Sequence, residues 1–212
     1  KYLASGSNDH TVRVWDTAGK GACVCVLKGH FGPVVSVAIC PDSTRIISAS
    51  TDKTCRVWSM AKGGWGPVSG AGEGPSQCTA TLRGHSDDLT SVCLDKKGGL
   101  ALTSSDDGTA RMWSIDRAIK SKDPPGHTNP SSPITACVWC MLDKQQVIVS
   151  ADCNGGVRCF KADAHTMVWK TRLYSSDRDN KEAVTSLAGS DPWVVCGMFQ
   201  VANRPPLGLG FR

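Results

Sequence analysis

The chain has 212 residues, of which 40% are hydrophobic and 20% are charged, a composition typical of folded globular proteins and not of disordered ones. Lysine and arginine number 24 and aspartate and glutamate 19, giving a formal net charge of +5. This small excess is not gathered into a basic block, which argues against nucleic acid or an anionic membrane as a partner. No apolar run approaches the ~18 residues that a membrane-spanning helix needs.

Short apolar runs, each bounded by turn-forming residues, recur along the chain and alternate with a period of two. Such alternation predicts strands, and no segment has a convincing amphipathic helical pattern. The strands are grouped in units of four, separated by polar tight turns. In chain order the clearest predicted strands are residues 3–7, 12–15, 23–27, 34–40, 46–50, 55–58, 78–82, 89–94, 100–104, 110–113, 134–140, 147–151, 157–160, 183–188 and 193–199.

A repeated signature centred on tryptophan organises these strands. Residues 7–16, 50–59 and 105–114 each contain an aspartate six positions before the tryptophan and an arginine two positions before it. A fourth copy keeps Arg158 but has Asn154 in place of the aspartate and Phe160 in place of the tryptophan. A Gly-His pair precedes Trp58 and Trp113 at one common spacing. Two motifs repeated at matching distances are far more specific than either motif alone.

Four-strand units with this signature resemble the WD40-repeat family, and the resemblance covers residues 1–199. It implies an all-β fold, a WD40-type β-propeller whose blades are four-stranded antiparallel sheets around a central channel. In the family's order, strand a follows the Gly-His pair, strand b comes next, strand c carries the tryptophan, and strand d is outermost. The chain holds about four to five blades, with an incomplete first and last one, whereas family members commonly close with about seven.

We therefore expect a fragment of a larger propeller. An open ring is one alternative, and a smaller ring in which the last strand a completes the first blade is another. Two segments interrupt the rhythm of strands. Residues 61–77 are rich in glycine and proline, which predicts a flexible loop, and residues 116–133 form a proline-rich connector in place of a clear strand d. Residues 200–212 lose the pattern and are predicted to be an irregular C-terminal tail.

The recurring polar residues predict a hydrogen-bonded network inside each blade. In the geometry that the family implies, His30 lies before strand a, Ser48 on strand b and Asp52 in the b–c turn. The Trp58 indole offers only a donor and the Asp52 carboxylate only acceptors, so a chain through hydroxyl and imidazole satisfies all four groups. The equivalent sets are His85, Thr103, Asp107 and Trp113 in the next blade and, without a histidine, Ser5, Asp9 and Trp15 in the first.

Serine, histidine and aspartate are also the catalytic set of many hydrolases. Catalysis, however, needs one such set with an oxyanion pocket and not one copy per repeat. We therefore predict that the network is structural and that the chain is not an enzyme. The arginines two positions before each aromatic residue could form an anion site or could cover rings and pair between blades, and we favour the second interpretation. They are Arg13, Arg56, Arg111 and Arg158.

The 11 cysteines are odd in number and unevenly spaced, which favours a reducing intracellular compartment. We expect the protein in the cytoplasm, with the nucleus as the alternative. Cys137 and Cys140 have the spacing of a zinc-finger pair, but residues three apart on a strand point to opposite faces. We expect neither a metal nor another cofactor.

The loops differ from repeat to repeat while the framework positions recur, which is typical of a scaffold that acquires its contacts through loops. We predict a non-catalytic scaffold that binds a protein or peptide partner through the face carrying the d–a and b–c loops. The alternative is a sensor or substrate-recognition module of a larger multidomain regulatory protein, such as a STAND-type switch or a ubiquitin-ligase receptor. The residues expected at the partner are Phe31, Lys53, Asp87, Asp88, Asp106 and Trp65.

Trp65 stands apart from the other predicted partner residues because it lies within the glycine-rich loop. An exposed tryptophan in such a loop is a candidate anchor for a partner. It could equally fold back onto its own blade.

Overall fold

The computed structural model describes residues 2–18, 21–60, 65, 77–118, 126–128, 132–142, 144–163, 166–172, 182–190 and 193–200. These residues form seventeen strands and one short helix. The strands pair antiparallel throughout, in five sheets that follow one another along the chain and are here called blades 1 to 5. The predicted all-β class and its four-stranded antiparallel sheets are confirmed.

Each blade is a meander in which consecutive strands are neighbours. Blade 1 contains β1 (Tyr2–Gly6), β2 (Val12–Asp16) and β3 (Ala22–Leu27), and blade 2 contains β4 (Val34–Ile39), β5 (Arg45–Ser50), β6 (Cys55–Ser59) and β7 (Gln77–Leu82). Blade 3 contains β8 (Leu89–Leu94), β9 (Leu100–Ser105), β10 (Thr109–Ser114) and β11 (Gly126–Thr128). Blade 4 contains β12 (Ile134–Leu142), β13 (Gln145–Asp152), β14 (Gly156–Lys161) and β15 (Met167–Arg172), and blade 5 contains β16 (Glu182–Ser190) and β17 (Trp193–Gln200).

The turn between strands b and c has the same backbone form in the first four blades. One residue of each turn has a positive φ, namely His10, Lys53, Gly108 and Gly155, with φ of 70, 66, 77 and 77°. Glycine adopts this left-handed conformation without a steric penalty, whereas His10 and Lys53 adopt it at a cost of about 1 kcal/mol. The turn therefore accepts a side chain at this position, and two of the blades carry one.

The hydrophobic core lies between neighbouring blades rather than within any one of them. Val14 and Leu27 of blade 1 pack with Ile46 and Trp58 of blade 2. The same arrangement joins blade 2 to blade 3, blade 3 to blade 4, and blade 4 to Val184 of blade 5. Because the sheets of blades 2 and 3 bury both of their faces against neighbouring blades, strands such as β5 and β9 are apolar or small at nearly every position.

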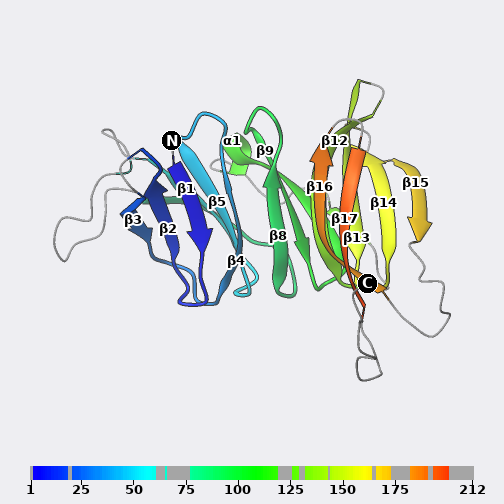
Figure 1. Cartoon of the computed structure of the whole chain (residues 1–212), viewed down its shortest axis with the longest axis horizontal. Coiled ribbons are helices and arrows are strands. Elements are labelled where there is room, and N and C mark those ends of the chain that lie inside the picture. Colours follow the sequence, from blue (N-terminus) through cyan, green and yellow to red (C-terminus); the bar gives the residue numbers. More distant parts are fainter. Residues whose placement is uncertain are drawn as a thin grey trace, which may run out of the picture.

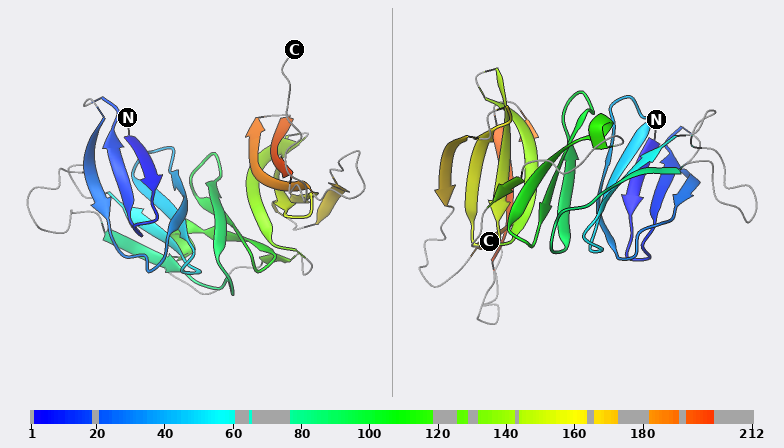
Figure 2. Two further views of the ribbon diagram at one scale, coloured as in Figure 1. Left: turned by 60° about the horizontal axis from the view of Figure 1, so that its bottom comes forward. Right: turned by 180° about the vertical axis from the view of Figure 1, so that it is seen from behind.

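The five blades stand side by side in chain order (Figure 1). The strands β4, β8, β12 and β16 are in contact from blade to blade along one side of the molecule. Figure 2 shows that blades 1 and 5 lie at opposite ends of an open arc. The strand β16 pairs with β17, and β1 pairs with β2. The alternative in which the last strand a completes the first blade is therefore wrong for the part of the chain described.

The connector between blades 3 and 4 contains more structure than its sequence predicts. A single helical turn, α1 (Ile115–Ala118), follows β10 directly, and β11 then pairs with β10 as a three-residue strand d. The prediction that this connector replaces a clear strand d is therefore wrong. The Gly126–His127 pair lies inside β11 and not in a loop before a strand a, so it is not a third copy of the Gly-His motif.

The other predicted irregular segments fall mostly outside the described residues. Of the predicted loop 61–77, only residues 65 and 77 are described. Of the predicted tail 200–212, only residue 200 is described, as the last residue of β17.

Candidate functional site

Four side chains of blade 2 form a continuous hydrogen-bonded chain. The Trp58 indole Nε1–H donates to Ser48 Oγ at 2.8 Å. Ser48 Oγ lies 2.7 Å from His30 Nε2, and His30 Nδ1 lies 2.8 Å from Asp52 Oδ2. Because the indole can only donate and the carboxylate only accept, the direction is fixed: the hydroxyl donates to Nε2, and the imidazole carries its proton on Nδ1. The structure brings these four sequence-predicted side chains together.

The Asp52 carboxylate also organises the turn that carries it. Its Oδ1 accepts the Thr54 backbone N–H at 3.0 Å and the Thr54 hydroxyl at 2.6 Å. Its Oδ2 accepts the Phe31 backbone N–H at 3.0 Å, so one carboxylate joins the b–c turn to the loop before strand a. The hydroxyl of Ser50 accepts the Asp52 N–H at 3.1 Å and donates to Gly32 O at 2.9 Å, which fixes the same two loops a second time.

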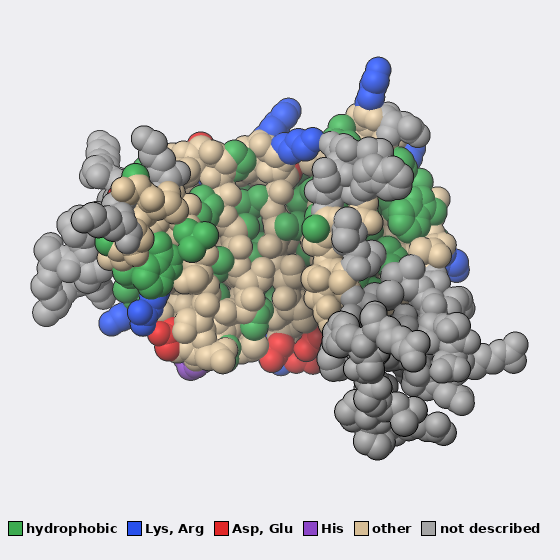
Figure 3. Space-filling view, in the orientation of Figure 1, with side chains coloured by type: hydrophobic (Ala, Val, Ile, Leu, Met, Phe, Trp, Pro, Cys, Tyr) green, Lys and Arg blue, Asp and Glu red, His purple; other side chains and the backbone are tan. Residues whose placement is uncertain are grey.

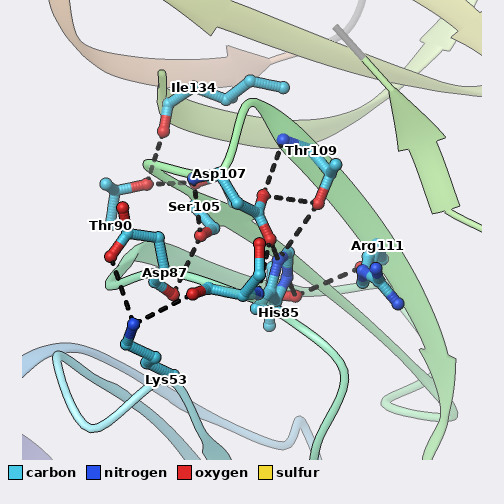
Figure 4. Close-up of polar contacts among 12 residues, drawn as sticks. Lys53, His85, Asp87, Thr90, Ser105, Asp107, Thr109, Arg111 and Ile134 are labelled. Carbon is cyan, nitrogen blue, oxygen red and sulfur yellow. Dashed lines mark hydrogen bonds and ion pairs between the residues drawn. The ribbon is translucent and has the colours of Figure 1, made fainter. Parts of the chain in front are cut away.

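Blade 3 repeats this arrangement atom for atom with one substitution, a threonine hydroxyl in place of the serine. Trp113 Nε1–H donates to Thr103 Oγ1 at 2.8 Å, Thr103 lies 2.8 Å from His85 Nε2, and His85 Nδ1 lies 2.9 Å from Asp107 Oδ2. Figure 4 shows how Thr109 and Ser105 flank this carboxylate in the turn. The repetition supports a structural role for the network.

The network is closed to any substrate. Ser48 and Thr103 are 0% exposed, and His30 and His85 are 6% and 7% exposed. In each blade the hydroxyl that would have to act as a nucleophile already accepts an indole N–H. A nucleophile must reach the reacting atom, so this burial distinguishes the set from the catalytic arrangement with the same residue types.

Blade 1 has only part of the network. Trp15 Nε1–H donates to Ser5 Oγ at 2.9 Å. Asp9 instead accepts the Thr11 hydroxyl at 2.6 Å and pairs with Arg13 at 3.1 Å. The Asp9 and Arg13 side chains are each 44% exposed, so this ion pair contributes little to stability.

Blade 4 uses a different acid, which sequence reasoning missed. Asp152, 3% exposed, occupies the position of Ser50 and accepts the backbone N–H groups of Asn154 and Gly156 at 2.9 and 2.8 Å. It also pairs with Arg158 at 3.4 Å. Asn154 Nδ2 donates to Ser132 Oγ at 2.5 Å. Asp152 and Arg158 can both be read in the sequence. The repeats, however, were aligned on the aspartate six positions before the aromatic residue, and blade 4 has Asn154 there.

Two opposing effects determine the pKa values of the His-Asp pairs. Burial lowers the pKa of His30 and of His85 below the ordinary 6.5, and it outweighs the neighbouring carboxylates, which raise it. Burial raises the pKa of Asp52, but hydrogen bonds from Thr54, Phe31 and His30 outweigh it and lower the pKa to about 2. The pKa of Asp107 is about 2 for the same reasons. The pair therefore consists of a neutral imidazole and a carboxylate at neutral pH.

These pKa values predict that acid destabilises the fold in two stages. Unfolding exposes His30 and His85, which then take up protons below their ordinary pKa of 6.5, so stability should start to fall as the pH drops through that value. The carboxylates contribute stability above their unfolded pKa of 3.8 that is lost toward pH 2. Urea midpoints measured at a series of pH values should show both declines. A midpoint that stays constant until the carboxylates titrate would contradict neutral histidines in the fold.

The arginines before the aromatic residues make different contacts from one blade to the next. Arg56 and Arg111 lie over the glycine of the Gly-His pair, such that a Cβ at Gly29 or Gly84 would come within 2.9 Å of a guanidinium nitrogen. The Arg56 guanidinium also lies 5.9 Å from the centroid of the Phe31 ring. This contact matches the interpretation that these arginines cover rings.

The loops before strand a and the b–c turns lie together at one end of the blades. Lys53 Nζ reaches from blade 2 to Ser86 O at 2.9 Å and to Asp87 Oδ1 at 3.5 Å, a contact visible in Figure 4. The Asp106 backbone N–H donates to Asp88 O at 2.9 Å. Acidic side chains gather at the lower edge of the molecule in Figure 3, the end at which β1 finishes. Five of the six residues predicted to contact a partner therefore share one surface.

Burial and neighbouring charges act together on one of these acids. The pKa of Asp106 is raised by burial first and then by the nearby carboxylates of Asp87, Asp88 and Asp107. Phe31, by contrast, is 82% exposed, although its backbone N–H is held by the buried network. This surface, defined by Phe31, Lys53, Asp87, Asp88 and Asp106, is called the loop face below.

Trp65 does not belong to the loop face. It is 3% exposed and packs with Val12, Val14 and Ile46 in the core between blades 1 and 2. Its Nε1–H donates to Ser43 O at 3.2 Å, beside the a–b turn at the opposite end of the blade. The prediction of an exposed anchor is therefore wrong for Trp65, and the alternative, in which it folds back onto the blade, describes its position.

Most of the cysteines lie in the inter-blade cores. Among the described side chains, ten cysteines form no disulfide. Cys137 packs in the core between blades 3 and 4, and Cys140 in the core between blades 4 and 5, so they point to opposite faces of β12. Among the described residues, no group of three histidine, cysteine, aspartate or glutamate side chains could hold a metal ion. None of the described helices is long or apolar enough to cross a membrane.

Comparison with known proteins adds to this geometry. The family described as WD domain, G-beta repeat matches residues 1–16, 21–59 and 76–114. The U5 small nuclear ribonucleoprotein 40 kDa protein of Dictyostelium discoideum is 27% identical over 157 residues, which are 74% of this chain and 39% of that protein. The F-box/WD repeat-containing protein sel-10 of Caenorhabditis elegans is 30% identical over 151 residues, 70% of this chain and 23% of that protein.

The small ribosomal subunit protein RACK1 of Dictyostelium discoideum is 34% identical over 97 residues, 45% of this chain and 27% of that protein. The matched stretch thus spans between 23% and 39% of the length of these relatives. The matched repeats coincide with blades 1 to 3, which hold the tryptophan-centred network. The repeats, the sheets and these relatives together show that the chain belongs to the WD40-repeat family.

Proposed function

We propose that this chain is a non-catalytic scaffold that binds a protein or peptide partner through the loop face. The observation that carries the proposal is the contrast at Phe31: its side chain is 82% exposed while its backbone N–H is bonded to the buried network. A large aromatic side chain held on a rigid backbone loses little conformational entropy when it is buried by a partner. Phe31 thus has the properties of an anchor residue.

The surroundings of Phe31 suggest which chemistry the partner brings. Lys53 is engaged by Ser86 O and lies close to only one of the acids, Asp87. The carboxylates of Asp106 and Asp88 lie close to each other on the same surface, within a chain whose overall charge is positive. Charge complementarity therefore favours a partner with cationic groups beside an apolar one. We expect its affinity to fall with added salt.

The first test places a photo-crosslinking phenylalanine analogue at position 31 and, as a control, at position 42 in the a–b turn at the other end of blade 2. Cross-linked partners are identified by mass spectrometry of the captured complexes. Partners captured from position 31 and absent from position 42 support the loop face. Equal capture from both positions would show that the loop face has no particular role.

The identified partner then allows a quantitative prediction. Replacing Phe31 with serine should weaken binding by about tenfold or more, because removing a hot-spot aromatic costs about 2 kcal/mol or more. Asp42→Asn, on the opposite end of the same blade, should leave the dissociation constant unchanged. Both values are measured by calorimetry, and circular dichroism confirms that each variant remains folded. An unchanged affinity for Phe31→Ser would remove the aromatic from the proposed site.

A second candidate function rests on the lengths of the relatives. The chain matches only 23% of the F-box/WD repeat-containing protein sel-10, whose name joins WD repeats to an F-box. On this alternative the loop face serves as the sensor or substrate-recognition surface of a larger multidomain regulatory protein. The complete open reading frame distinguishes the two, since an additional catalytic or assembly domain would favour the module.

We also propose an intracellular, cytoplasmic location. The ten cysteines whose side chains are described form no disulfide, and several of them lie deep between blades, as expected for thiols in a reducing compartment. Fractionation of cells expressing the full-length protein tests the location.

A further inference from the structure

Two cysteines face each other across the interface between blades 3 and 4. Cys93 lies on β8 and Cys137 on β12, and both belong to the hydrophobic core between these blades. The two thiols are hydrogen-bonded to each other. The Cys137 thiol also donates to Leu102 O at 3.7 Å, and Leu102 is the residue that pairs with Cys93 in the sheet of blade 3. Each blade therefore directs one thiol at the thiol of the other.

The register of the first strands of blades 2 to 5 sets these cysteines opposite each other. Adjacent residues of a strand face opposite sides of the sheet, so each first strand presents one side chain to the preceding blade and the next to the following blade. Counted from the bulge that all four strands share, three equivalent pairs lie in the cores between blades: Ala38 with Val92, Cys93 with Cys137, and Val138 with Leu187. Of these three pairs, only the one between blades 3 and 4 has a cysteine on both sides.

The strands β8 and β12 lie close enough for a side chain of one to reach the backbone of the other. Thr90 Oγ1 of β8 donates to Ile134 O of β12 at 2.6 Å. A disulfide requires the two sulfur atoms to lie about 2 Å apart. Because the Cys93 and Cys137 thiols are already in contact, this distance can be closed by side-chain rotation and a small approach of the two strands, without a change of fold.

We propose that Cys93 and Cys137 form an oxidation site, at which hydrogen peroxide converts the two thiols to a disulfide that joins blades 3 and 4. The Cys93 thiolate attacks one peroxide oxygen, the O–O bond breaks, and Cys93 becomes a sulfenic acid as one water leaves. The Cys137 sulfur then attacks the Cys93 sulfur, so that the S–S bond forms, the S–O bond breaks and a second water leaves. The thiols are oxidised, the peroxide is reduced, and both thiol protons end in the two waters.

The surroundings of the two thiols determine the order and the speed of these steps. Cys93 is partly exposed and Cys137 is 4% exposed, so Cys93 is the thiol that meets the peroxide first. The hydrogen bond to Cys137 and burial both raise the pKa of Cys93 well above its ordinary value. Little of Cys93 is then thiolate at neutral pH, and the first step should be slow. We expect the site to respond to sustained oxidant and to react later than the exposed Cys23.

The disulfide would enclose the rest of blade 3, because β9, β10 and β11 all lie between Cys93 and Cys137. A cross-link over such a long segment restricts the unfolded chain and stabilises the folded one. The oxidised protein should therefore unfold at a higher urea concentration than the reduced protein, and a reductant should remove the difference. This effect goes beyond the proposed function and does not involve the loop face.

Peptide mapping of the full chain tests the site. The folded protein is treated with hydrogen peroxide, the remaining thiols are blocked with N-ethylmaleimide, and the chain is digested without reduction. Mass spectrometry should find the peptides of Cys93 and Cys137 joined and lighter than their sum by two hydrogen atoms. A chain unfolded in urea before the peroxide is added should give mixed pairings, with this one a minor product. Thiols at 93 and 137 that remain open to the maleimide while Cys23 is oxidised, or equal yields from the folded and the unfolded chain, would overturn the proposal.

Three variants connect the cross-link to the change in stability. Cys93→Ala introduces the residue that blade 2 has at the equivalent position, and Cys137→Val introduces the one that blade 3 has there. Both variants should lose the joined peptide and show no rise of the urea midpoint after peroxide. Cys23→Ala, which removes an exposed thiol outside this interface, should keep both the peptide and the rise. A rise that persists in Cys93→Ala or in Cys137→Val would show that the Cys93–Cys137 bond is not its cause.

Discussion

Replacing Asp52 with asparagine should lower the free energy of unfolding by about 1–3 kcal/mol, the cost of leaving buried donors unsatisfied. The amide oxygen can keep the Thr54 contacts, but the amide nitrogen then meets the Phe31 N–H and the His30 Nδ1–H, which are both donors. Urea denaturation followed by circular dichroism gives the difference. In blade 3, which holds the same network, Asp107→Asn should lower the free energy of unfolding by a similar amount.

Two other aspartates, Asp106 and Asp9, provide the controls. Asp106→Asn removes a carboxylate whose pKa is raised by burial and by adjacent carboxylates, so its effect on folding should be close to zero. Asp9→Asn alters the blade without a histidine partner, where the acid binds Thr11 and Arg13 near the surface, and should cost less than Asp52→Asn. Similar small effects at all three positions would mean that the buried network does not hold the turn.

Replacing Trp65 with alanine should destabilise the chain by about 3–5 kcal/mol, as for other large aromatic side chains removed from a core. Trp65 fills the space between blades 1 and 2 beside Val14 and Ile46, and its indole N–H is bonded to Ser43 O. The loss should appear as a lower urea midpoint. If binding to the partner of the loop face can be measured, its affinity should not change, because Trp65 lies at the other end of the blade.

Trp169→Ala is the matched control for Trp65→Ala. It removes the same side chain from an exposed strand, and surface substitutions of this kind usually change stability by less than about 0.5 kcal/mol. Both variants should be compared at the same protein concentration. Comparable losses for the two tryptophans would contradict the burial of Trp65.

Most of the strands and the core of the network could be predicted from the sequence because they depend on short, repeated spacings. The period of two defined the strands, and the matched distances from histidine to tryptophan identified which polar groups meet. A further pattern was present but not used: serine, then aspartate, then threonine at alternate positions, as in Ser50, Asp52 and Thr54. Those hydroxyls complete the turn.

The remaining features depend on contacts that no local pattern records. Trp65 is buried by residues of two blades, and nothing in a glycine-rich segment indicates that its aromatic residue returns to a core. The strand β11 has only three residues and follows a proline-rich stretch, so it lacks the alternation that defines a strand. Asp152 was missed because blade 4 supplies its carboxylate two positions earlier than the other blades.

The closure of each Trp-Ser-His-Asp set within one contiguous stretch of chain has a consequence for how such a molecule can change over time. All of these hydrogen bonds form within residues 30–58 or within residues 85–113. A substitution in one repeat therefore leaves the hydrogen-bonded networks of its neighbours intact. A single unit can therefore lack the tryptophan and the aspartate, as blade 4 does with Phe160 and Asn154, while the network of each neighbouring blade stays complete.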